Sequence, residues 1–267
     1  MSDRIIESLT NPTVKAVRAL HMKKSREETG RFLSEGLKFV GEALDLGFSP
    51  RILMVGRDAR PHPLLERAMA ETRNAGGEVI RVTHDILAKV SRKENPQAVV
   101  AVFEQRFADL EALKPETAPC WVALEDVRDP GNLGAIIRTA DAAGCGAVIL
   151  VGDCTDPFSV EAVRATMGSV FAVPLVRCTR EAFLAWLQTW PGISVGARLD
   201  GAVHYRQAAY QAPTLVVMGN EAQGLSPEAA AACELGVKIP MRGRADSLNL
   251  AVATGIMIYA VTDTLES

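Results

Sequence analysis

The chain has 267 residues, of which 48% are hydrophobic and 23% are charged, as in an ordinary soluble protein with one large or two modest domains. Its formal net charge of −3 argues against a generic, strongly basic nucleic-acid binder. The most apolar stretch, residues 248–261, is too short to span a bilayer, and no apolar signal segment follows the N-terminal charges. The sequence therefore predicts a cytoplasmic protein without a membrane partner.

Residues 1–106 are expected to form a small α/β domain. Residues 1–50 are predicted to be helical, with one helix beginning at Asn11-Pro12 and another within residues 32–44. Strands are predicted at 51–55, 78–82 and 98–103, and helices at 63–75 and 84–90. Alternating strands and helices favour an α/β sandwich. The charged segment 107–118 is interpreted as a linker.

Basic residues are concentrated in this first part of the chain. Residues 1–105 carry 17 Lys and Arg against 14 Asp and Glu, whereas residues 106–267 carry 12 against 18. Lys23, Lys24, Arg26 and Arg31 lie in the densest basic stretch and are candidates for contact with nucleic-acid phosphates. The alternative is an ordinary solvated helix face.

Residues 119–267 are expected to form a second α/β domain. Short apolar strands are predicted at 120–124, 147–151, 172–175, 193–197, 215–218 and 237–239, with helices between them. Runs of this type are typical of a mostly parallel sheet that is covered on both faces. The whole chain is thus assigned to the α/β class.

The segment 129–144 has the features of a ligand site at a strand end. Pro130-Gly131 is expected to form a turn, Asn132 to cap a helix over residues 133–143, and Gly144 to end that helix. Arg138 lies within this helix, and an apolar strand follows it. In α/β proteins, ligands bind at such glycine-containing turns. The alternative is an ordinary strand–helix connection.

Two later segments have a similar organisation. An apolar strand at 215–218 leads into Gly219-Asn220-Glu221, and Ser226-Pro227 is expected to start the next helix. The strand at 237–239 ends at Pro240 and is followed by a polar loop. Ser247 is then expected to cap a very apolar helix.

Together, these three segments closely resemble the motifs of the SpoU (TrmH) branch of the SPOUT RNA methyltransferases. The family patterns Asn-x-Gly-x-x-x-Arg-Thr-Ala, Gly-x-Glu-x-x-Gly and Ile-Pro-Met-x-Gly-x-x-x-Ser-Leu-Asn correspond to residues 132–140, 219–224 and 239–249. Residues 164–169 are similar to a further family stretch, with Thr166 in place of a serine. Val160-Glu161 stands where a Pro-Lys pair is common, which removes one possible cation near the site.

The resemblance implies a ribose 2′-O-methyltransferase that uses S-adenosylmethionine and acts on RNA, with 23S-type ribosomal RNA favoured. A tRNA 2′-O-methyltransferase and a catalytically silent RNA-binding or ribosome assembly protein are the alternatives. The family resemblance further implies a trefoil knot in the C-terminal domain and a ribosomal-protein-like RNA-binding domain at the N-terminus. It also implies a homodimer that pairs through the apolar C-terminal helix.

The resemblance also implies roles for individual residues. Gly219, Ile239 and Leu248 would line the cofactor pocket, largely through main-chain atoms. The side chains expected around the reacting ribose are Asn132, Arg138, Glu221, Ser247 and Asn249. Arg138 would activate the hydroxyl, either as a base or, because arginine stays protonated, by stabilising the developing alkoxide. A helix-terminal carboxylate is the alternative for Glu221, and a simple N-cap is the alternative for Ser247.

Other chemistries have weaker support in the sequence. The four histidines and five cysteines lack the spacing of metal ligands, so no metal is expected and the cysteines are interpreted as reduced thiols. Gly192-x-Ser-x-Gly196 matches the nucleophile elbow of hydrolases, but its serine falls inside a predicted strand. No glycine-rich phosphate loop of the dinucleotide or nucleoside triphosphate type occurs.

Overall fold

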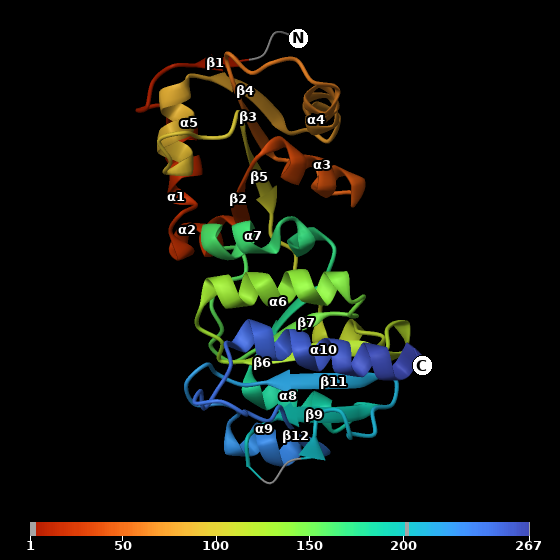
Figure 1. The fold of residues 1–267 in the computed structure, drawn as a ribbon. Helices are drawn as coiled ribbons and strands as arrows, with labels where there is room; N and C mark the ends of the chain where they lie inside the picture. The colour runs from red at the N-terminus through yellow and green to blue at the C-terminus, as the bar shows by residue number, and fades with distance from the viewer. Residues whose placement is uncertain (1–3, 201–202, 267) are drawn as a thin grey trace. The chain divides into compact units, whose positions relative to one another are not determined.

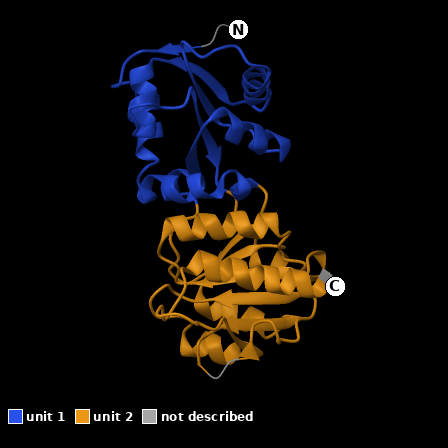
Figure 2. Cartoon of the chain, viewed as in Figure 1, with its two compact units in different colours: residues 1–105, 158–171 blue, residues 106–157, 172–267 orange. Residues whose placement is uncertain are grey.

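The computed structural model describes residues 4–200 and 203–266. The chain forms two compact units (Figure 2). Unit 1 comprises residues 1–105 and 158–171, and unit 2 comprises residues 106–157 and 172–267. Unit 1 is therefore completed by a segment from the middle of the chain, which the sequence pattern does not indicate.

Unit 1 is built on a five-stranded sheet with the order β1-β4-β3-β5-β2 (Figure 1). Strands β1, β4 and β3 are parallel, whereas β5 is antiparallel to both β3 and β2. The strands are β1 (Arg4–Ile6), β2 (Arg31–Glu35), β3 (Ile52–Gly56), β4 (Glu78–Val82) and β5 (Val99–Glu104). The helices are α1 (Pro12–Ala19), α2 (Lys23–Thr29), α3 (Leu37–Asp45), α4 (Pro63–Asn74), α5 (His84–Ser91), α7 (Val160–Thr166) and the 3₁₀ turn η3 (Ser169–Phe171).

Residues 158–171 contribute directly to the core of unit 1. The ring centroids of Phe158 and Phe32 lie 4.8 Å apart, and those of Phe171 and Phe103 also lie 4.8 Å apart. Both Phe32 and Phe103 are almost completely buried. Aromatic pairs at these separations add to the stabilisation from buried apolar area. The segment is thus part of the hydrophobic core and not a surface loop.

The prediction that residues 1–50 are helical is partly wrong. Helix α1 begins at Pro12, with Asn11 as its N-cap, as expected. However, residues 4–6 form β1 and residues 31–35 form β2, which pairs with β5 along its whole length. Short apolar runs fit either a strand or a buried helix, and here pairing with distant strands decided the outcome.

Unit 2 is built on a seven-stranded sheet with the order β10-β12-β9-β11-β6-β7-β8, and all its recorded strand pairs are parallel. The predicted parallel α/β sheet is therefore confirmed. The strands are β6 (Cys120–Glu125), β7 (Val148–Val151), β8 (Leu175–Cys178), β9 (Ile193–Ala197), β10 (Val203–His204), β11 (Thr214–Met218) and β12 (Leu235–Lys238). The helices are α6 (Pro130–Ala142), α8 (Arg180–Leu187), α9 (Pro227–Ala232) and α10 (Leu250–Glu266), with 3₁₀ turns η1 (Leu110–Ala112) and η2 (Pro115–Thr117).

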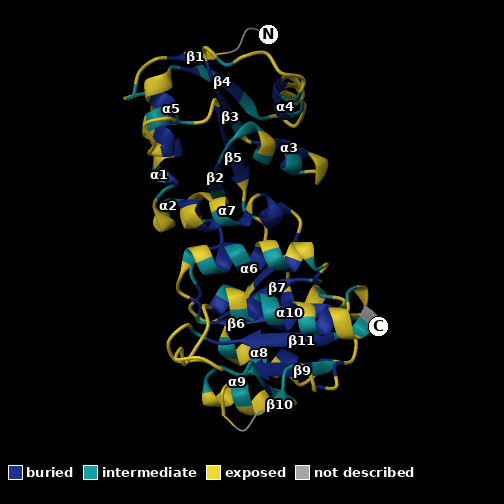
Figure 3. Ribbon diagram, viewed as in Figure 1, coloured by how far each residue is buried: buried dark blue, intermediate teal, exposed yellow. Residues whose placement is uncertain are grey.

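Helices cover both faces of this sheet. Helix α8 packs against a cluster that includes Trp121, Ala123, Leu215 and Val217. Successive strand residues point to opposite faces, and the intervening residues of β6 and β11 are also buried (Figure 3). Helix α10 contacts α6, β11 and β6, so it covers the other face together with α6. The central strands are consequently apolar on both sides, as the sequence predicted.

Three further predictions can be compared with the structure. The strand predicted at 172–175 is instead β8, which begins after Pro174, because proline cannot donate a ladder hydrogen bond. The segment 107–118 is joined to unit 2, since Ala108 donates its N–H to the Leu175 carbonyl at 2.8 Å and Leu110 is buried. Ser194 lies inside β9, where its hydroxyl accepts from the Glu234 N–H, as expected of a strand residue.

No helix in the described ranges is long and apolar enough to cross a membrane.

Candidate functional site

Helix α6 begins three residues earlier than the sequence predicted. Asp129 is the N-cap, because its side chain accepts a hydrogen bond of 2.6 Å from the Asn132 N–H, and Pro130 occupies the first helical position. Proline is well suited to that position, since its missing N–H would have no partner in the helix. The predicted turn at Pro130-Gly131 and cap at Asn132 are therefore wrong. The helix ends as expected, with Gly144 in a left-handed conformation.

This earlier start leaves the Asn132 side chain free to contact Glu221. The Asn132 Nδ2 donates to Glu221 Oε1 at 3.3 Å. The same carboxylate accepts from the backbone N–H groups of Arg128 at 3.2 Å and Asp129 at 3.1 Å. Burial raises the pKa of Glu221, but these hydrogen bonds outweigh it and hold the pKa below its usual value. Glu221 is thus a fixed, ionised acceptor beside the start of α6, where the helix dipole also favours a negative charge.

Asn249 connects this carboxylate to helix α10. Its Oδ1 accepts from the N–H groups of Ala251 at 2.9 Å and Val252 at 3.3 Å, so Asn249 caps α10. Its Nδ2 donates to Asn132 Oδ1 at 2.8 Å. We call the resulting series of side chains, Glu221, Asn132 and Asn249, the polar chain. It joins one residue from each of the three sequence motifs.

The N-cap predicted at Ser247 is therefore wrong. Helix α10 begins at Leu250, and the Ser247 hydroxyl lies 3.5 Å from an Asp246 carboxylate oxygen. Asn249 is closer to the first turn and its amide reaches the free N–H groups. A side-chain oxygen caps a helix by meeting the N–H groups two or three residues ahead of it, a position that Ser247 does not have.

Arg138 is exposed on α6. Its neighbours Ile136, Ile137 and Ala140 are fully buried, so packing of the helix does not depend on Arg138. Within residues 4–200 and 203–266, its guanidinium makes no hydrogen bond or ion pair. The side chain is therefore available to a ligand.

A cavity of about 840 Å³ lies beside the polar chain. It is bordered by the segment after β9, the loop between β11 and α9, and the loop between β12 and α10. Of the predicted site residues, Gly219, Glu221, Ile239, Ser247 and Leu248 line this cavity. Among the residues that the structure describes, Asn132, Arg138 and Asn249 are not part of its lining.

The backbone of the β11–α9 loop makes a tight cradle at the cavity. A Cβ on Gly219 would lie 2.0 Å from the carbonyl carbon of Gly224 and 2.2 Å from the Leu225 nitrogen, so no side chain fits there. Asn220 exchanges two backbone hydrogen bonds of 2.9 Å with Gly224, and its Nδ2 donates to the Asp126 carbonyl at 2.8 Å. Gly219 therefore allows the two ends of this loop to pack against each other at the cavity, where any larger residue would force them apart.

The side chains of the cavity suit an adenosine that carries both a positive and a negative group. Met218, Leu225 and Val237 supply apolar surface for a base, and Glu221, Asp200 and Asp246 supply negative charge. Arg198 supplies positive charge, and its buried Nε lacks a hydrogen-bond partner in the described part of the chain. S-adenosylmethionine combines an adenine with a sulfonium, an ammonium and a carboxylate, so these residues fit it.

Comparison with known proteins identifies the family. Residues 119–259 match the model of the SpoU rRNA Methylase family, and residues 11–101 match an MRM3-like substrate binding domain. The chain belongs to the SpoU rRNA methylase family.

SpoU relatives match over nearly the whole chain. The chain is 33% identical over 255 residues to the 23S rRNA (guanosine(2553)-2′-O)-methyltransferase RlmP of Bacillus subtilis, covering 95% of this chain and 97% of the relative. It is similar to an AdoMet-bound rRNA methyltransferase from Sinorhizobium meliloti, with a TM-score of 0.93, 48% identity and 99% coverage of both chains. It is also similar to AviRb from Streptomyces viridochromogenes in complex with AdoMet, with a TM-score of 0.85, 29% identity and coverage of 96% and 99%.

Two pocket residues of this SpoU domain were missed in the sequence. Arg198 and Asp200 follow β9 and line the cavity, and their side chains lie 3.7 Å apart. Their position at the carboxyl end of a parallel strand is a signal that could have identified them, because ligands of open α/β sheets bind there. In residues 4–200 and 203–266, no three His, Cys, Asp or Glu side chains are grouped as metal ligands.

The predicted phosphate-binding residues have different environments. Lys23 and Lys24 are exposed on α2 and lie 3.8 Å from Glu27 and Glu28, respectively. Such exposed ion pairs contribute little to the free energy of folding, and they do not prevent a lysine from reaching a phosphate.

Arg26 is a different case, because it is only 4% exposed. Its guanidinium donates to the backbone carbonyls of Leu20 at 2.8 Å and His21 at 3.1 Å. Arg26 therefore closes the turn between α1 and α2, and its predicted role in phosphate binding is corrected to a structural one. Arg31 is half-buried in β2.

Proposed function

We propose that this protein is an S-adenosylmethionine-dependent methyltransferase that methylates a ribose 2′-hydroxyl in ribosomal RNA of the 23S type. The observation that carries the proposal is the polar chain. Asn132 is 89 residues from Glu221 and 117 residues from Asn249 in the sequence, yet the three side chains meet beside the cavity. Ribosomal RNA is favoured over tRNA because relatives that match nearly the full chain are named as 23S rRNA methyltransferases. A silent assembly factor is disfavoured because the polar motif side chains are present.

In this proposal, Gly219, Ile239 and Leu248 hold the cofactor. Gly219 allows the β11–α9 loop to close tightly at the cavity, while Ile239 and Leu248 add apolar surface to the same cavity. When bound, S-adenosylmethionine supplies the methyl group. Holding the hydroxyl in line with that group accounts for much of the rate in reactions of this kind.

The polar chain positions the substrate ribose. Glu221 lines the cavity and is held by three hydrogen-bond donors, so it offers a fixed negative acceptor. Asn132 and Asn249 orient it, and Ser247 adds a hydroxyl to the cavity wall. A fixed acceptor needs no reorganisation when the ribose binds, which lowers the free-energy barrier of the reaction.

Arg138 is proposed to stabilise the negative charge that develops on the ribose oxygen. The group is exposed and has no protein partner in the described ranges, so it can meet a ligand. A guanidinium remains protonated at neutral pH, which favours charge stabilisation over removal of a proton. Its planar pair of donors also suits a phosphate of the substrate.

We propose further that the protein is a cytoplasmic homodimer, with α10 at its interface and a trefoil knot around the cofactor. Helix α10 is strongly apolar, yet Val252 is 53% exposed and Tyr259 is 45% exposed in the single chain. Val252 and Tyr259 are two helical turns apart and so lie on the same face of α10, where a second chain could cover both. A symmetric dimer would bury them on both chains.

The test is single-turnover methylation at saturating S-adenosylmethionine, with radioactive methyl transfer measured separately into unmodified 23S rRNA and tRNA. The wild type should label 23S rRNA. Arg138→Ala should lower that rate about a hundredfold or more without changing cofactor affinity, as expected when a charge-stabilising donor is removed. Arg138→Lys should recover little.

Lys114→Ala is the matched control, because it removes an exposed cation of unit 2 that does not line the cavity. It should methylate at the wild-type rate. Labelling of tRNA alone would show that tRNA, and not 23S rRNA, is the substrate. If the protein binds S-adenosylmethionine but transfers no methyl group to either RNA, the result would favour the catalytically silent alternative. A rate within threefold of wild type for Arg138→Ala would contradict the role given to Arg138.

A further inference from the structure

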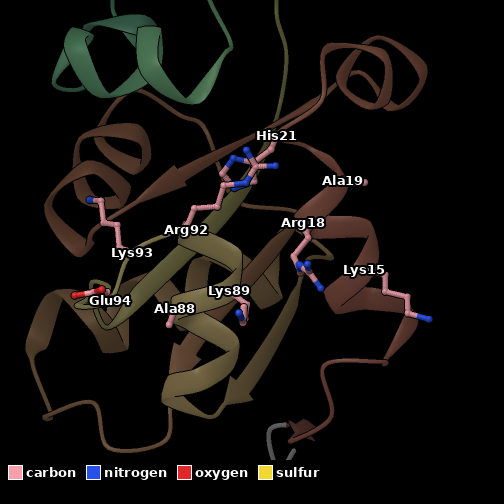
Figure 4. Close-up of a pocket in the computed structure, with 9 residues that line it drawn as sticks. All are labelled: Lys15, Arg18, Ala19, His21, Ala88, Lys89, Arg92, Lys93 and Glu94. Atoms are coloured by element: carbon pink, nitrogen blue, oxygen red, sulfur yellow. The ribbon is translucent and has the colours of Figure 1, made fainter.

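A second cavity, of about 710 Å³, lies within unit 1 between helices α1 and α5. Its lining is dominated by positive charge: Lys15 and Arg18 on α1, Lys89 on α5, and Arg92 and Lys93 just after α5. Figure 4 shows the α1 and α5 side chains on two sides of the cleft, with Arg92 next to the His21 ring. Among the residues that the structure describes, Glu94 is the one acidic residue of this lining. We call this cavity the basic cleft.

Most cations of the basic cleft have no acidic partner in the described ranges, whereas several other cations of unit 1, such as Arg51 and Arg67, are paired. Lys93 lies 2.7 Å from Glu35 and is therefore already paired. In contrast, Lys15, Arg18, Lys89 and Arg92 make no ion pair within the described ranges. Four cations without counter-ions around one cavity raise its positive potential and favour an anionic ligand.

Arg92 ends helix α5 at the basic cleft. Arg92 is the C-cap of α5 and has a φ of +56°, in the left-handed region. Glycine is the usual residue in that conformation, because a Cβ makes it unfavourable. Many helices end on a left-handed residue, and α7 ends in the same way at Met167. This helix end places the Arg92 side chain in the lining of the cleft.

His21 forms part of the wall of the basic cleft. Its Nε2 lies 2.7 Å from the Val90 carbonyl. Burial lowers the pKa of His21, the Val90 carbonyl raises it, and the positive charges of Arg92 and Arg164 lower it again, so that the pKa stays below its usual value. The charge of Glu161 raises it slightly. An anion bound beside Arg92 would offset the positive charge of the two arginines and so raise the pKa of His21.

The helix dipole is not a sufficient explanation for this arrangement. Arg18 and Lys89 lie in the last turns of α1 and α5, where a cation is favourable. That effect stabilises each helix separately, however, and does not require the two helices to place their cations around the same cavity. It also does not explain Lys15, which lies one turn before the end of α1.

We propose that the basic cleft binds phosphates of the RNA backbone, with Arg18, Lys89 and Arg92 as the principal contacts. The proposal rests on RNA being the substrate of the enzyme. It assigns the main phosphate contacts of unit 1 to residues other than Lys23 and Lys24. Such contacts position the RNA without reading its sequence, and they make binding depend on salt.

The experiment uses the full-length protein and a fluorescein-labelled, mixed-sequence, single-stranded RNA of 20 nucleotides, with affinity measured by anisotropy between 50 and 300 mM KCl. Arg18→Gln/Lys89→Gln should weaken binding at low salt by about tenfold or more. The slope of log affinity against log salt should become shallower by about 0.7 for each phosphate that the variant no longer neutralises. Lys38→Gln/Arg60→Gln, which removes two exposed cations of unit 1 outside the cleft, should change neither quantity.

Arg92→Gly separates binding from folding. Glycine suits the left-handed φ, so this variant should melt at or above the wild-type temperature while it binds RNA more weakly. NMR titration of His21 gives a second readout: RNA should raise its pKa, and inorganic phosphate at the same phosphate concentration should raise it less.

The outcomes are distinct. Unchanged RNA affinity and salt slope in both cleft variants would overturn the proposal, as would an equally large weakening of RNA binding in Lys38→Gln/Arg60→Gln. A His21 response to inorganic phosphate as large as the response to RNA would make the cleft a small-anion site and would also overturn it. A wild type that binds RNA through the cleft but methylates none would refute the proposed function and leave the cleft assignment intact.

Discussion

Asn249 has two roles that can be separated by substitution. Its Oδ1 caps helix α10, and its Nδ2 donates to Asn132, which in turn contacts Glu221. Asn249→Ala removes both roles. Asn249→Ser keeps an oxygen that can cap the helix, but the shorter side chain cannot reach Asn132. The pair of variants therefore isolates the contact that holds the polar chain together.

The expected magnitudes follow from these contacts. Loss of an N-cap costs about 1 kcal/mol in the free energy of unfolding, and loss of one side-chain hydrogen bond costs about 0.5–1 kcal/mol at an exposed position such as this. Asn249→Ala should therefore destabilise the protein by about 1.5–2 kcal/mol, and Asn249→Ser by about 0.5–1 kcal/mol. Both should reduce methylation by at least about tenfold, because each removes an interaction that orients Glu221.

Urea denaturation and single-turnover methylation measure the two effects. A double-mutant cycle with Asn132→Ala tests the contact itself, since Asn249→Ser should have little further effect on stability once Asn132 has been truncated. The expected coupling energy is about 0.5–1 kcal/mol. Additive effects of Asn132→Ala and Asn249→Ser, within about 0.3 kcal/mol, would refute the contact. Wild-type methylation by Asn249→Ser would refute its positioning role.

Three further predictions concern the cavity, the carboxylate and the dimer. Gly219→Ala should abolish S-adenosylmethionine binding in calorimetry, because its Cβ would lie 2.0 Å from Gly224; binding within tenfold of wild type would contradict the cradle. Glu221→Gln should be less stable than wild type above about pH 4.5, and the difference should vanish as the pH falls through the depressed folded-state pKa; a difference that does not change with pH would show that the charge contributes nothing. Tyr259→Glu should convert a dimer into monomers in light scattering, and a monomeric wild type would rule out the proposed interface.

The sequence alone determined the class of the fold and the position of the motifs. Buried parallel strands are apolar on both faces, so β6, β7 and β11 were recognisable as short apolar runs. The caps at Asn11 and Ser226 were also predictable, because each is followed by a proline at the first helical position. These features depend on residues that are adjacent in the chain.

Tertiary structure decided which of two neighbouring polar residues caps each of the helices α6 and α10. Asp129 and Asn132 can both cap a helix, and so can Ser247 and Asn249. Asp129 is used at α6 because Pro130 favours a start there, and this leaves Asn132 free to meet Glu221 and Asn249. No local pattern contains that information, since the partners are about 90 and 117 residues away.

The same reason applies to unit 1. Residues 158–171 follow strands of the second sheet in sequence, yet their phenylalanines complete the first core. Arg18 and Arg92 are more than seventy residues apart and come together only because α1 and α5 pack side by side on one face of the sheet. Sequence patterns report periodicity within a segment, whereas contacts between distant segments depend on which apolar faces bury one another, and only the folded chain decides that.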